Sequence, residues 1–314
     1  MIDLKQAVRK GEWLEMPLPL FSGQDTSDMP KNGDHPYTVK QWLLTLEQFP
    51  EKWINRLFSV GGIRLENGVL RLRAFPEADL RVHLLYKAAA ATVRQPVPPV
   101  LFEDDHCLVF DKPIGMPVHP AFPGQSGTLD EASIRYMLQT GQSAPVRHIH
   151  RLDEDTSGPV LYAKNDLAQW RLDEAMRSKQ IERRYIALVQ GIISQTQGTI
   201  DEPIGRDRHH SARRRVSPTG DQAVTHYEVL ERYDRASLVR IQLETGRTHQ
   251  IRVHFSYLGH PLIGDKLYGG DQRLLDHQAL HGERLFFSHP WDKRGMEIHS
   301  PYPAWLSKLI QRLS

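Results

Sequence analysis

The alternation of apolar and polar positions predicts a small unit of helices and a hairpin near the start of the chain. Apolar positions three or four apart predict a helix over 38–46, which Thr38 can cap, and a second helix over 51–60. Alternation on both sides of Asn67-Gly68 predicts a hairpin over 63–72, because this dipeptide favours a tight turn. Two helices and a hairpin therefore form the first predicted module.

Segments without a regular period surround this module. Prolines and glycines interrupt residues 1–37, and we expect an irregular extension there. A proline-rich stretch over 94–99 is typical of a stiff join between folded units. We therefore predict two domains, residues 1–95 and residues 96–314.

Short apolar runs dominate the second predicted domain. They predict strands over 107–110, 159–163, 183–189, 223–230, 237–243 and 285–288. Helices are predicted over 166–178 with Asn165 as its cap, after Thr248 with its end at Gly259, and over 304–313. Irregularly spaced strands with few helices between them favour an α+β fold with a mixed, largely antiparallel sheet over a doubly wound parallel sheet.

Composition narrows the class of protein. A chain of 314 residues that is 39% apolar can bury a substantial core. Its 40 basic and 38 acidic residues give a net charge of only +2, so any affinity for nucleic acid must come from local patches. The single cysteine, Cys107, cannot form an internal disulfide, and no stretch reaches the ~20 apolar residues of a membrane span. We expect a cytoplasmic protein.

The stretch 150–158, His-Arg-Leu-Asp-Glu-Asp-Thr-Ser-Gly, is the first candidate for chemistry. It stands immediately before a predicted buried strand, where a rigid element can hold polar side chains in place. Asp153 is its middle carboxylate. On composition alone, an ordinary solvated turn remains the alternative.

Two further clusters are basic. The stretch 244–252 joins a strand to a helix, and its Arg247 can pair with a carboxylate. The stretch 206–215 is rich in arginine and histidine and can contact phosphates. The alternatives are a surface arginine in the first case and a solvated charged face in the second.

A metal site is a separate hypothesis. His148, His150 and Asp153 are spaced like ligands, and an extended segment would place both imidazoles on one face. The sequence shows no second tight cluster of histidine, cysteine and acidic residues to complete the shell, so we predict no metal. Cys107 has no obvious base beside it for thiol chemistry.

Five motifs in order resemble those of the RluA-type RNA pseudouridine synthases, from about residue 100 to the end of the chain. They are Asp111-Lys112-Pro113-Ile114-Gly115, His150-Arg151-Leu152-Asp153 with Thr156-Ser157-Gly158, Arg184-Tyr185-Ile186-Ala187-Leu188-Val189, Thr245-Gly246-Arg247-Thr248-His249-Gln250-Ile251-Arg252, and Gly259-His260-Pro261-Leu262-Ile263-Gly264-Asp265 with Leu280-His281 and His289-Pro290.

This resemblance implies an isomerase that converts uridine in ribosomal or transfer RNA to pseudouridine without a cofactor. Asp153 is then the catalytic carboxylate, Arg247 its charge partner, and Tyr185 an aromatic face for a flipped uracil. Arg151 is expected to fill the space that the base vacates. Backbone contacts are expected from the basic loop, at Arg206, Arg208, Arg213, Arg214 and Arg215.

The N-terminal module resembles in outline the S4-type RNA-binding domain of that family, in a degenerate form that acidic residues have made less basic. We expect a monomer whose partner is RNA. Two alternatives stay open at this point. One is a metal-dependent hydrolase that uses His148, His150 and Asp153, and the other is an RNA-binding protein without catalysis.

Overall fold

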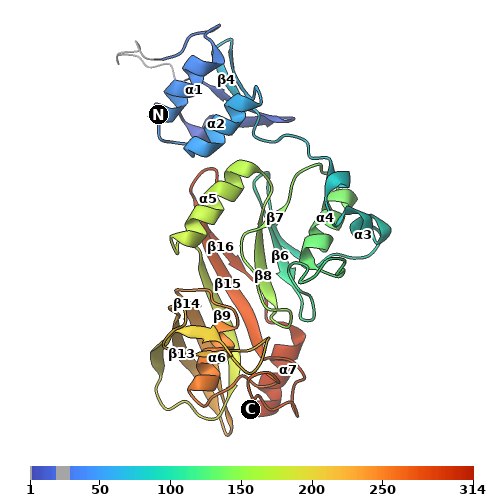
Figure 1. Cartoon of the computed structure of the whole chain (residues 1–314), viewed down its shortest axis with the longest axis vertical. Coiled ribbons are helices and arrows are strands. Elements are labelled where there is room, and N and C mark those ends of the chain that lie inside the picture. The colour runs from blue at the N-terminus through green and yellow to red at the C-terminus, as the bar shows by residue number, and fades with distance from the viewer. Residues whose placement is uncertain (1, 19–28) are drawn as a thin grey trace.

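The computed structural model describes residues 2–18 and 29–314 and shows two parts joined by one extended segment (Figure 1). The first part contains η1 (Leu4–Gln6), β1 (Val8–Lys10), β2 (Trp13–Pro17), α1 (Pro36–Thr45), α2 (Glu51–Ser59), β3 (Ile63–Glu66) and β4 (Val69–Leu72). Its four strands form one antiparallel sheet in the order β1-β2-β4-β3. The two predicted helices and the hairpin are confirmed.

Local sequence explains these elements. The predicted turn forms at Asn67 and Gly68, which have φ angles of +52° and +72°, as a tight hairpin requires. Pro36 opens α1, where a missing N–H costs nothing, and His35 rather than Thr38 is its cap. The expectation of an irregular segment before residue 38 was wrong for β1 and β2, while residues 19–28 lie outside the described residues.

The segment after the first part packs on the second. It contains η2 (Leu80–Val82) and α3 (Tyr86–Ala91), and α3 lies against α4 (Leu129–Gln139). Ala89 belongs to the same buried cluster as Phe110 of the second part. The boundary predicted at residues 95/96 therefore separates elements that pack together.

Two antiparallel sheets build the second part. One has the order β5-β6-β8-β7 and the other the order β10-β13-β14-β9-β15-β16. Their strands are β5 (Val100–Glu103), β6 (Cys107–Lys112), β7 (Arg147–His148), β8 (Gly158–Ala163), β9 (Glu182–Gln190), β10 (Gln197–Asp201), β13 (Val224–Tyr233), β14 (Ala236–Leu243), β15 (Leu280–Ser288) and β16 (Gly295–His299). A separate hairpin pairs β11 (Ile204–Arg206) with β12 (Arg214–Val216). All pairings between these strands are antiparallel, which agrees with the predicted α+β class.

Four helices lie against these sheets: α4, α5 (Asp166–Arg177), α6 (Gln250–Tyr257) and α7 (Ala304–Leu313). Asn165 caps α5 as predicted, because its side chain accepts the Ala168 N–H at 2.8 Å. The short helix ends before Gly259 as predicted, and α7 has the predicted bounds. Sequence reasoning missed α4, the strands β5, β7, β10 and β16, and the β11–β12 hairpin.

The two sheets of the second part meet where β8 begins. Ser157 forms a parallel bridge with His281 of β15, and the Gly282 N–H donates to the Ser157 carbonyl at 2.7 Å. The stretch 150–158 therefore crosses the junction of the two sheets. In residues 2–18 and 29–314 no helix is long and apolar enough to cross a membrane.

Candidate active site

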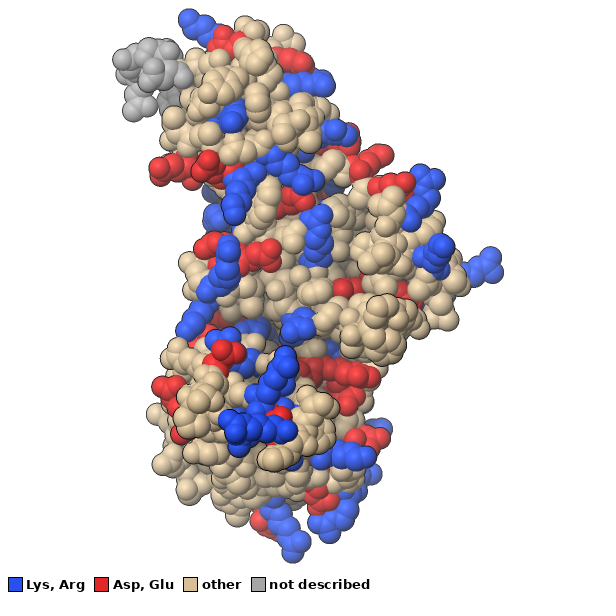
Figure 2. All heavy atoms as spheres, viewed as in Figure 1, with Lys and Arg blue, Asp and Glu red and all other residues tan. Residues whose placement is uncertain are grey.

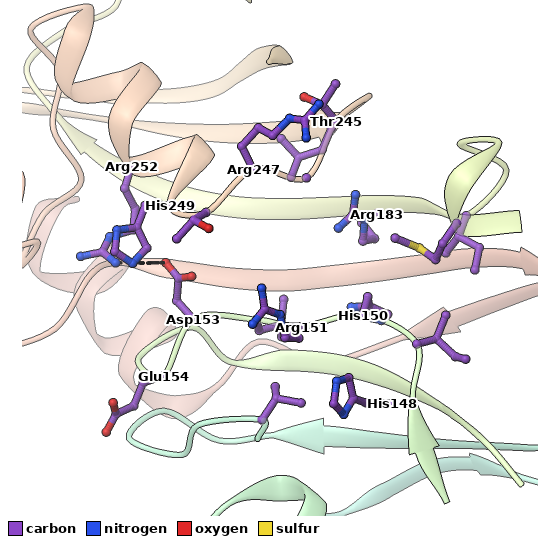
Figure 3. A pocket seen from close by; sticks show the side chains of 18 of the residues that line it. His148, His150, Arg151, Asp153, Glu154, Arg183, Thr245, Arg247, His249 and Arg252 are labelled. Atoms are coloured by element: carbon purple, nitrogen blue, oxygen red, sulfur yellow. Dashed lines mark hydrogen bonds and ion pairs between the residues drawn. The ribbon is translucent and has the colours of Figure 1, made fainter. Parts of the chain in front are cut away.

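A pocket of about 1170 Å³ opens at this junction (Figure 3). Three segments supply most of the polar side chains of its wall: the loop before β8, the start of β9, and the turn between β14 and α6. The labelled residues of Figure 3 are His148, His150, Arg151, Asp153, Glu154, Arg183, Thr245, Arg247, His249 and Arg252. The first two sequence clusters thus meet in one cavity.

The loop that carries Asp153 is held from several sides. Thr156 donates its N–H to the Asp153 carbonyl at 3.0 Å, which closes a tight turn. Lys112 is fully buried, and its Nζ donates to the carbonyl of Glu154 at 2.7 Å and to two carbonyls of the 113–116 turn. Three acceptors around one ammonium group fix the two turns against each other.

The glycine that ends this loop is required by close packing. Gly158 has a φ of +126°, and a Cβ there would lie 2.5 Å from the carbonyl oxygen of Gly282. Any side chain at this position would push β8 away from β15. Ser157 adds a hydrogen bond of 2.9 Å between its Oγ and Nδ1 of His281. Ser157 and Gly158 of the motif therefore anchor the loop at the junction of the two sheets.

Asp153 forms its ion pair with Arg252, not with Arg247. Nη1 of Arg252 donates to Oδ2 of Asp153 at 3.0 Å, and the same guanidinium binds Asp265 at 2.7 and 2.9 Å. Burial alone would lower the pKa of Arg252, but the carboxylates of Asp265 and Asp153 raise it above its ordinary value. The side chain of Asp153 keeps 27% of its surface exposed to the pocket, so it is both oriented and accessible.

Arg247 lies at the rim instead. Its Nε donates to the carbonyl of Gln222 at 2.9 Å, and its Nη1 is 3.9 Å from Asp221. The predicted Asp153–Arg247 pair is thus wrong. The predicted cap at Thr248 is wrong as well, since His249 stands at that position with a φ of +58°. This left-handed residue turns the chain so that Arg252, in the first turn of α6, faces the carboxylate.

His249 is the second group near the carboxylate. Its Nε2 is 3.9 Å from Oδ2 of Asp153, and its Nδ1 is 2.9 Å from the hydroxyl of Tyr268. That hydroxyl accepts the Arg214 N–H, so its own proton is free to point at Nδ1. Burial lowers the pKa of His249, although the charge of Asp153 acts in the opposite direction. A neutral ring with its proton on Nε2, facing Asp153, fits these contacts.

Tyr185 is buried, with 5% of its surface exposed. It packs in the core beside Val239 and Ile251, and its edge lines a small cavity of about 70 Å³ together with Asp153. Burial raises the pKa of Tyr185, an effect that Asp153 increases and the nearby Arg183 opposes. The side chain thus has a core-packing role and also borders the site.

Arg151 and the basic loop lie outside this buried group. Arg151 is exposed at the pocket, and its Nη1 is 3.1 Å from Nε2 of His119. The basic residues occupy the β11–β12 hairpin, whose strand β12 packs against α6. Arg206, Arg208 and Arg215 are exposed, whereas Arg213 and Arg214 are half-buried. Lys and Arg side chains also form a broken line down the face shown in Figure 2.

The proposed metal ligands do not converge. Nδ1 of His148 binds Asp130 at 3.0 Å, and Nε2 of His150 accepts the Leu161 N–H at 3.2 Å. Burial and the charge of Arg183 lower the pKa of His150 to about 3, so its ring is neutral. Both imidazoles instead support the loop through hydrogen bonds.

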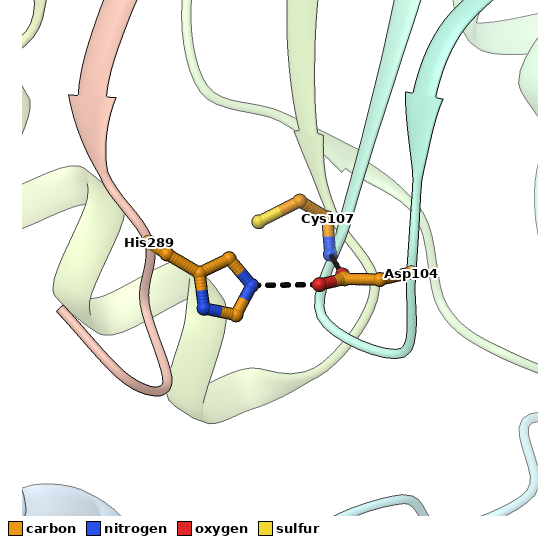
Figure 4. A group of neighbouring side chains, drawn as sticks. All are labelled: Asp104, Cys107 and His289. Atoms are coloured by element: carbon orange, nitrogen blue, oxygen red, sulfur yellow. Dashed lines mark hydrogen bonds and ion pairs between the residues drawn. The ribbon is translucent and has the colours of Figure 1, made fainter. Parts of the chain in front are cut away.

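A different cluster brings together Asp104, Cys107 and His289 (Figure 4), although sequence reasoning found no such group. Both ring nitrogens of His289 are already engaged, by Asp104 at 2.7 Å and by Asp292 at 2.9 Å. Asp104 also accepts the N–H groups of His106 and Cys107, and burial raises the pKa of the thiol well above its usual range. These contacts fix the turn that presents Trp291 to the first part, where its indole donates to the carbonyl of Leu4 at 3.0 Å.

A family model described as RNA pseudouridylate synthase matches residues 106–257. A Bacillus subtilis protein named "Uncharacterized RNA pseudouridine synthase YjbO" is 43% identical over 248 residues, which cover 79% of this chain and 85% of that protein. The chain belongs to the RNA pseudouridine synthase family. The predicted isomerase class is therefore confirmed, and neither alternative is supported.

Two further likenesses support this assignment. "Ribosomal large subunit pseudouridine synthase D" of Pseudomonas aeruginosa is 36% identical over 292 residues, covering 86% of this chain and 91% of that protein. The solved structure "Human RNA Pseudouridylate Synthase Domain Containing 1" is 26% identical, with a TM-score of 0.55, and covers 68% of this chain and 93% of that one. The likeness to an S4-type domain stays a prediction.

Sequence reasoning missed Arg252 and Asp265 as members of the site. Asp265 has 1% of its surface exposed and Arg252 has 7%, so each is a charged residue in an apolar setting. A buried charge needs a partner of opposite sign, and the position of Arg252 between Ile251 and Val253 was the available signal.

Proposed function

We propose that Asp153 carries the isomerisation of uridine to pseudouridine in this protein. This proposal rests on the position of Asp153. Its carboxylate is partly exposed in a large pocket, and Arg252 holds one of its oxygens at 3.0 Å. The reaction breaks the N1–C1′ bond of the nucleotide, turns the uracil and joins C5 to C1′; C5 then loses its proton, and N1 takes one up. Asp153 can attack C1′ as a nucleophile or remove a proton at C2′, and both roles suit a fixed carboxylate beside the sugar.

The neighbouring residues take supporting roles in this proposal. Arg252 holds the carboxylate in one orientation, and Tyr185 offers an aromatic edge to the flipped uracil. Arg151, exposed at the pocket mouth, occupies the space left in the RNA stack. Arg247 at the rim and the basic residues of the β11–β12 hairpin contact the RNA backbone.

The substrate is ribosomal or transfer RNA, with ribosomal RNA favoured because curated relatives bear the name of a large-subunit ribosomal enzyme. In this proposal the protein acts as a monomer in the cytoplasm. No cofactor takes part in the proposed chemistry, since the isomerisation needs neither an oxidant nor an outside group donor.

Mapping pseudouridines in total RNA from cells with and without this protein tests the proposal. We expect one or a few sites to disappear with the gene and to return with the wild-type protein but not with Asp153→Asn. Treatment with a chelator should leave the activity of purified protein unchanged. Full restoration by Asp153→Asn would contradict the proposed role of the carboxylate.

A further inference from the structure

Arg183 is a positively charged residue of the pocket that has no role in the isomerisation proposed for Asp153. Alternation along β9 places residues 183 and 185 on the same face of the strand. Arg183 accordingly borders both the large pocket and the small cavity, together with Asp153. Figure 3 shows it between the loop of Arg151 and the turn that carries Thr245 and Arg247.

The charge of Arg183 has no protein counterion among residues 2–18 and 29–314. The adjacent carboxylates bind elsewhere: Glu182 pairs with Arg184 at 2.5 Å, and Glu244 pairs with His226 at 2.7 Å. Nε of Arg183 is buried without a hydrogen-bond partner in the described part of the chain. Arg252, by contrast, binds two carboxylates. A half-buried guanidinium without an anion is unfavourable by itself, which indicates that a ligand completes it.

Gly246 leaves room for this side chain. A Cβ at residue 246 would lie 3.0 Å from Nη2 and 3.1 Å from Nη1 of Arg183, closer than ordinary contacts. The backbone of Gly246 is not in the left-handed region, so its conformation does not demand glycine. The glycine lets the guanidinium lie directly against the backbone of the β14–α6 turn, and a side chain there would push the guanidinium away.

We propose that Arg183 is a substrate-binding residue that holds a backbone phosphate adjoining the target uridine. The proposal rests on the pseudouridine synthase activity assigned above and names a binding group for it. A phosphate is the anion that RNA brings to the pocket, and the planar guanidinium binds its oxygens in pairs. A nucleotide that enters the site of Asp153 and Tyr185 carries its two flanking phosphates with it to the pocket wall.

RNA in which the charge of one phosphate at a time is removed tests whether Arg183 binds that phosphate. The probe is a short RNA hairpin with a mapped target uridine, in three forms: unmodified, or with an uncharged methylphosphonate linkage 5′ or 3′ of that uridine. The full-length proteins are wild type, Arg183→Gln, Arg183→Lys and Arg177→Gln. Arg177 is a matched control, because it borders the same pocket but is 74% exposed and paired with Glu174. Both Kd and the single-turnover rate constant are measured.

With the wild-type protein, we expect one of the two methylphosphonate linkages to lower the ratio of the single-turnover rate constant to Kd by about 10- to 100-fold. For Arg183→Gln, the same ratio should already be lower by a similar factor with the unmodified RNA. The methylphosphonate linkage should then lower it no further. Arg183→Lys should fall between the two, and Arg177→Gln should keep the full effect of the linkage. This loss of additivity marks a direct contact.

If the linkage and Arg183→Gln lower the rate independently, so that their effects multiply, Arg183 does not bind that phosphate and the proposal is overturned. The same holds if neither linkage affects the wild type. Should the hairpin bind without being isomerised, the proposed function fails, yet the effect of the linkages on Kd still decides the role of Arg183.

A second variant reaches Arg183 without changing its charge. Gly246→Ala should displace the guanidinium and reproduce the reduced sensitivity to the linkage, while the thermal unfolding midpoint stays close to the wild-type value. Unchanged sensitivity in Gly246→Ala, at unchanged stability, would contradict the proposed geometry.

Discussion

The floor of the pocket, where Asp153 and Arg252 lie, and its rim, where Arg247 lies, hold their arginines in different ways. At the floor, the side chain of Arg252 is 9% exposed and binds Asp153 and Asp265. At the rim, the side chain of Arg247 is 42% exposed and lies 3.9 Å from Asp221, and outside the pocket Arg208 and Arg215 of the β11–β12 hairpin are exposed. Buried pairs are screened little by salt and have fixed geometry, whereas exposed charges are screened and mobile. We therefore expect the floor to set the chemistry and the rim to contribute affinity.

The largest expected effect is at the floor. Asp153→Asn keeps the shape of the side chain but removes its capacity to act as nucleophile or base, so the single-turnover rate should fall by about 10³-fold or more. RNA affinity and the unfolding midpoint should change little. Residual activity within about tenfold of wild type would move the catalytic role to Glu154 or Asp155.

The second largest effect is expected at Arg252, and substitution of Arg247 should have a smaller one. Arg252→Lys cannot bind two carboxylates through a planar group, and we expect its single-turnover rate to fall by about 100-fold. Arg247→Lys keeps its charge at the rim and should change Kd by less than about tenfold. Rates and affinities measured for both variants check this order. If Arg247→Lys proved the more damaging in rate, the carboxylate would change partners when RNA binds.

Charge removal in the hairpin should affect affinity alone. Replacing Arg213, Arg214 and Arg215 with Ala should weaken binding to all RNAs similarly and flatten the slope of log affinity against log salt by about 0.7 per lost contact. The backbone N–H of Arg214 still reaches Tyr268, so the rate at saturating RNA should hold. Replacement of Lys308 and Arg312 on α7 is the control. A lower saturating rate with an unchanged salt slope would show that the hairpin acts on the floor.

Removing the first part should have the smallest effect on the salt slope. Residues 1–75 contain ten basic and nine acidic residues, so their loss changes the net charge by one. The slope should shift less than in the triple-Ala variant. Stability should fall, because Leu167 and Trp291 belong to the core of the first part and would become exposed. If the slope of log affinity against log salt were flatter for the truncated protein than for the triple-Ala variant, the main contacts with RNA would lie in the N-terminal part.

Local sequence determined much of this protein. The turn at Asn67-Gly68, the cap at Asn165 and the periodic helix α7 all depend on neighbouring residues, and each formed as predicted. The ordered motifs indicate the family, and they identify Asp153 as the candidate carboxylate without reference to the pocket. These features are readable because the interactions that produce them span only a few residues.

The tertiary structure alone decided which charged groups meet. Asp153 and Arg252 are 99 residues apart, and no local pattern states whether Arg247 or Arg252 faces the carboxylate. The left-handed backbone at His249 and the burial of Asp265 make that choice. Likewise, Arg183 and Gly246 come together only when β9 pairs with β14. A contact between distant segments depends on the packing of whole sheets, and a partner for a buried charge is selected by the space and the carboxylates found there.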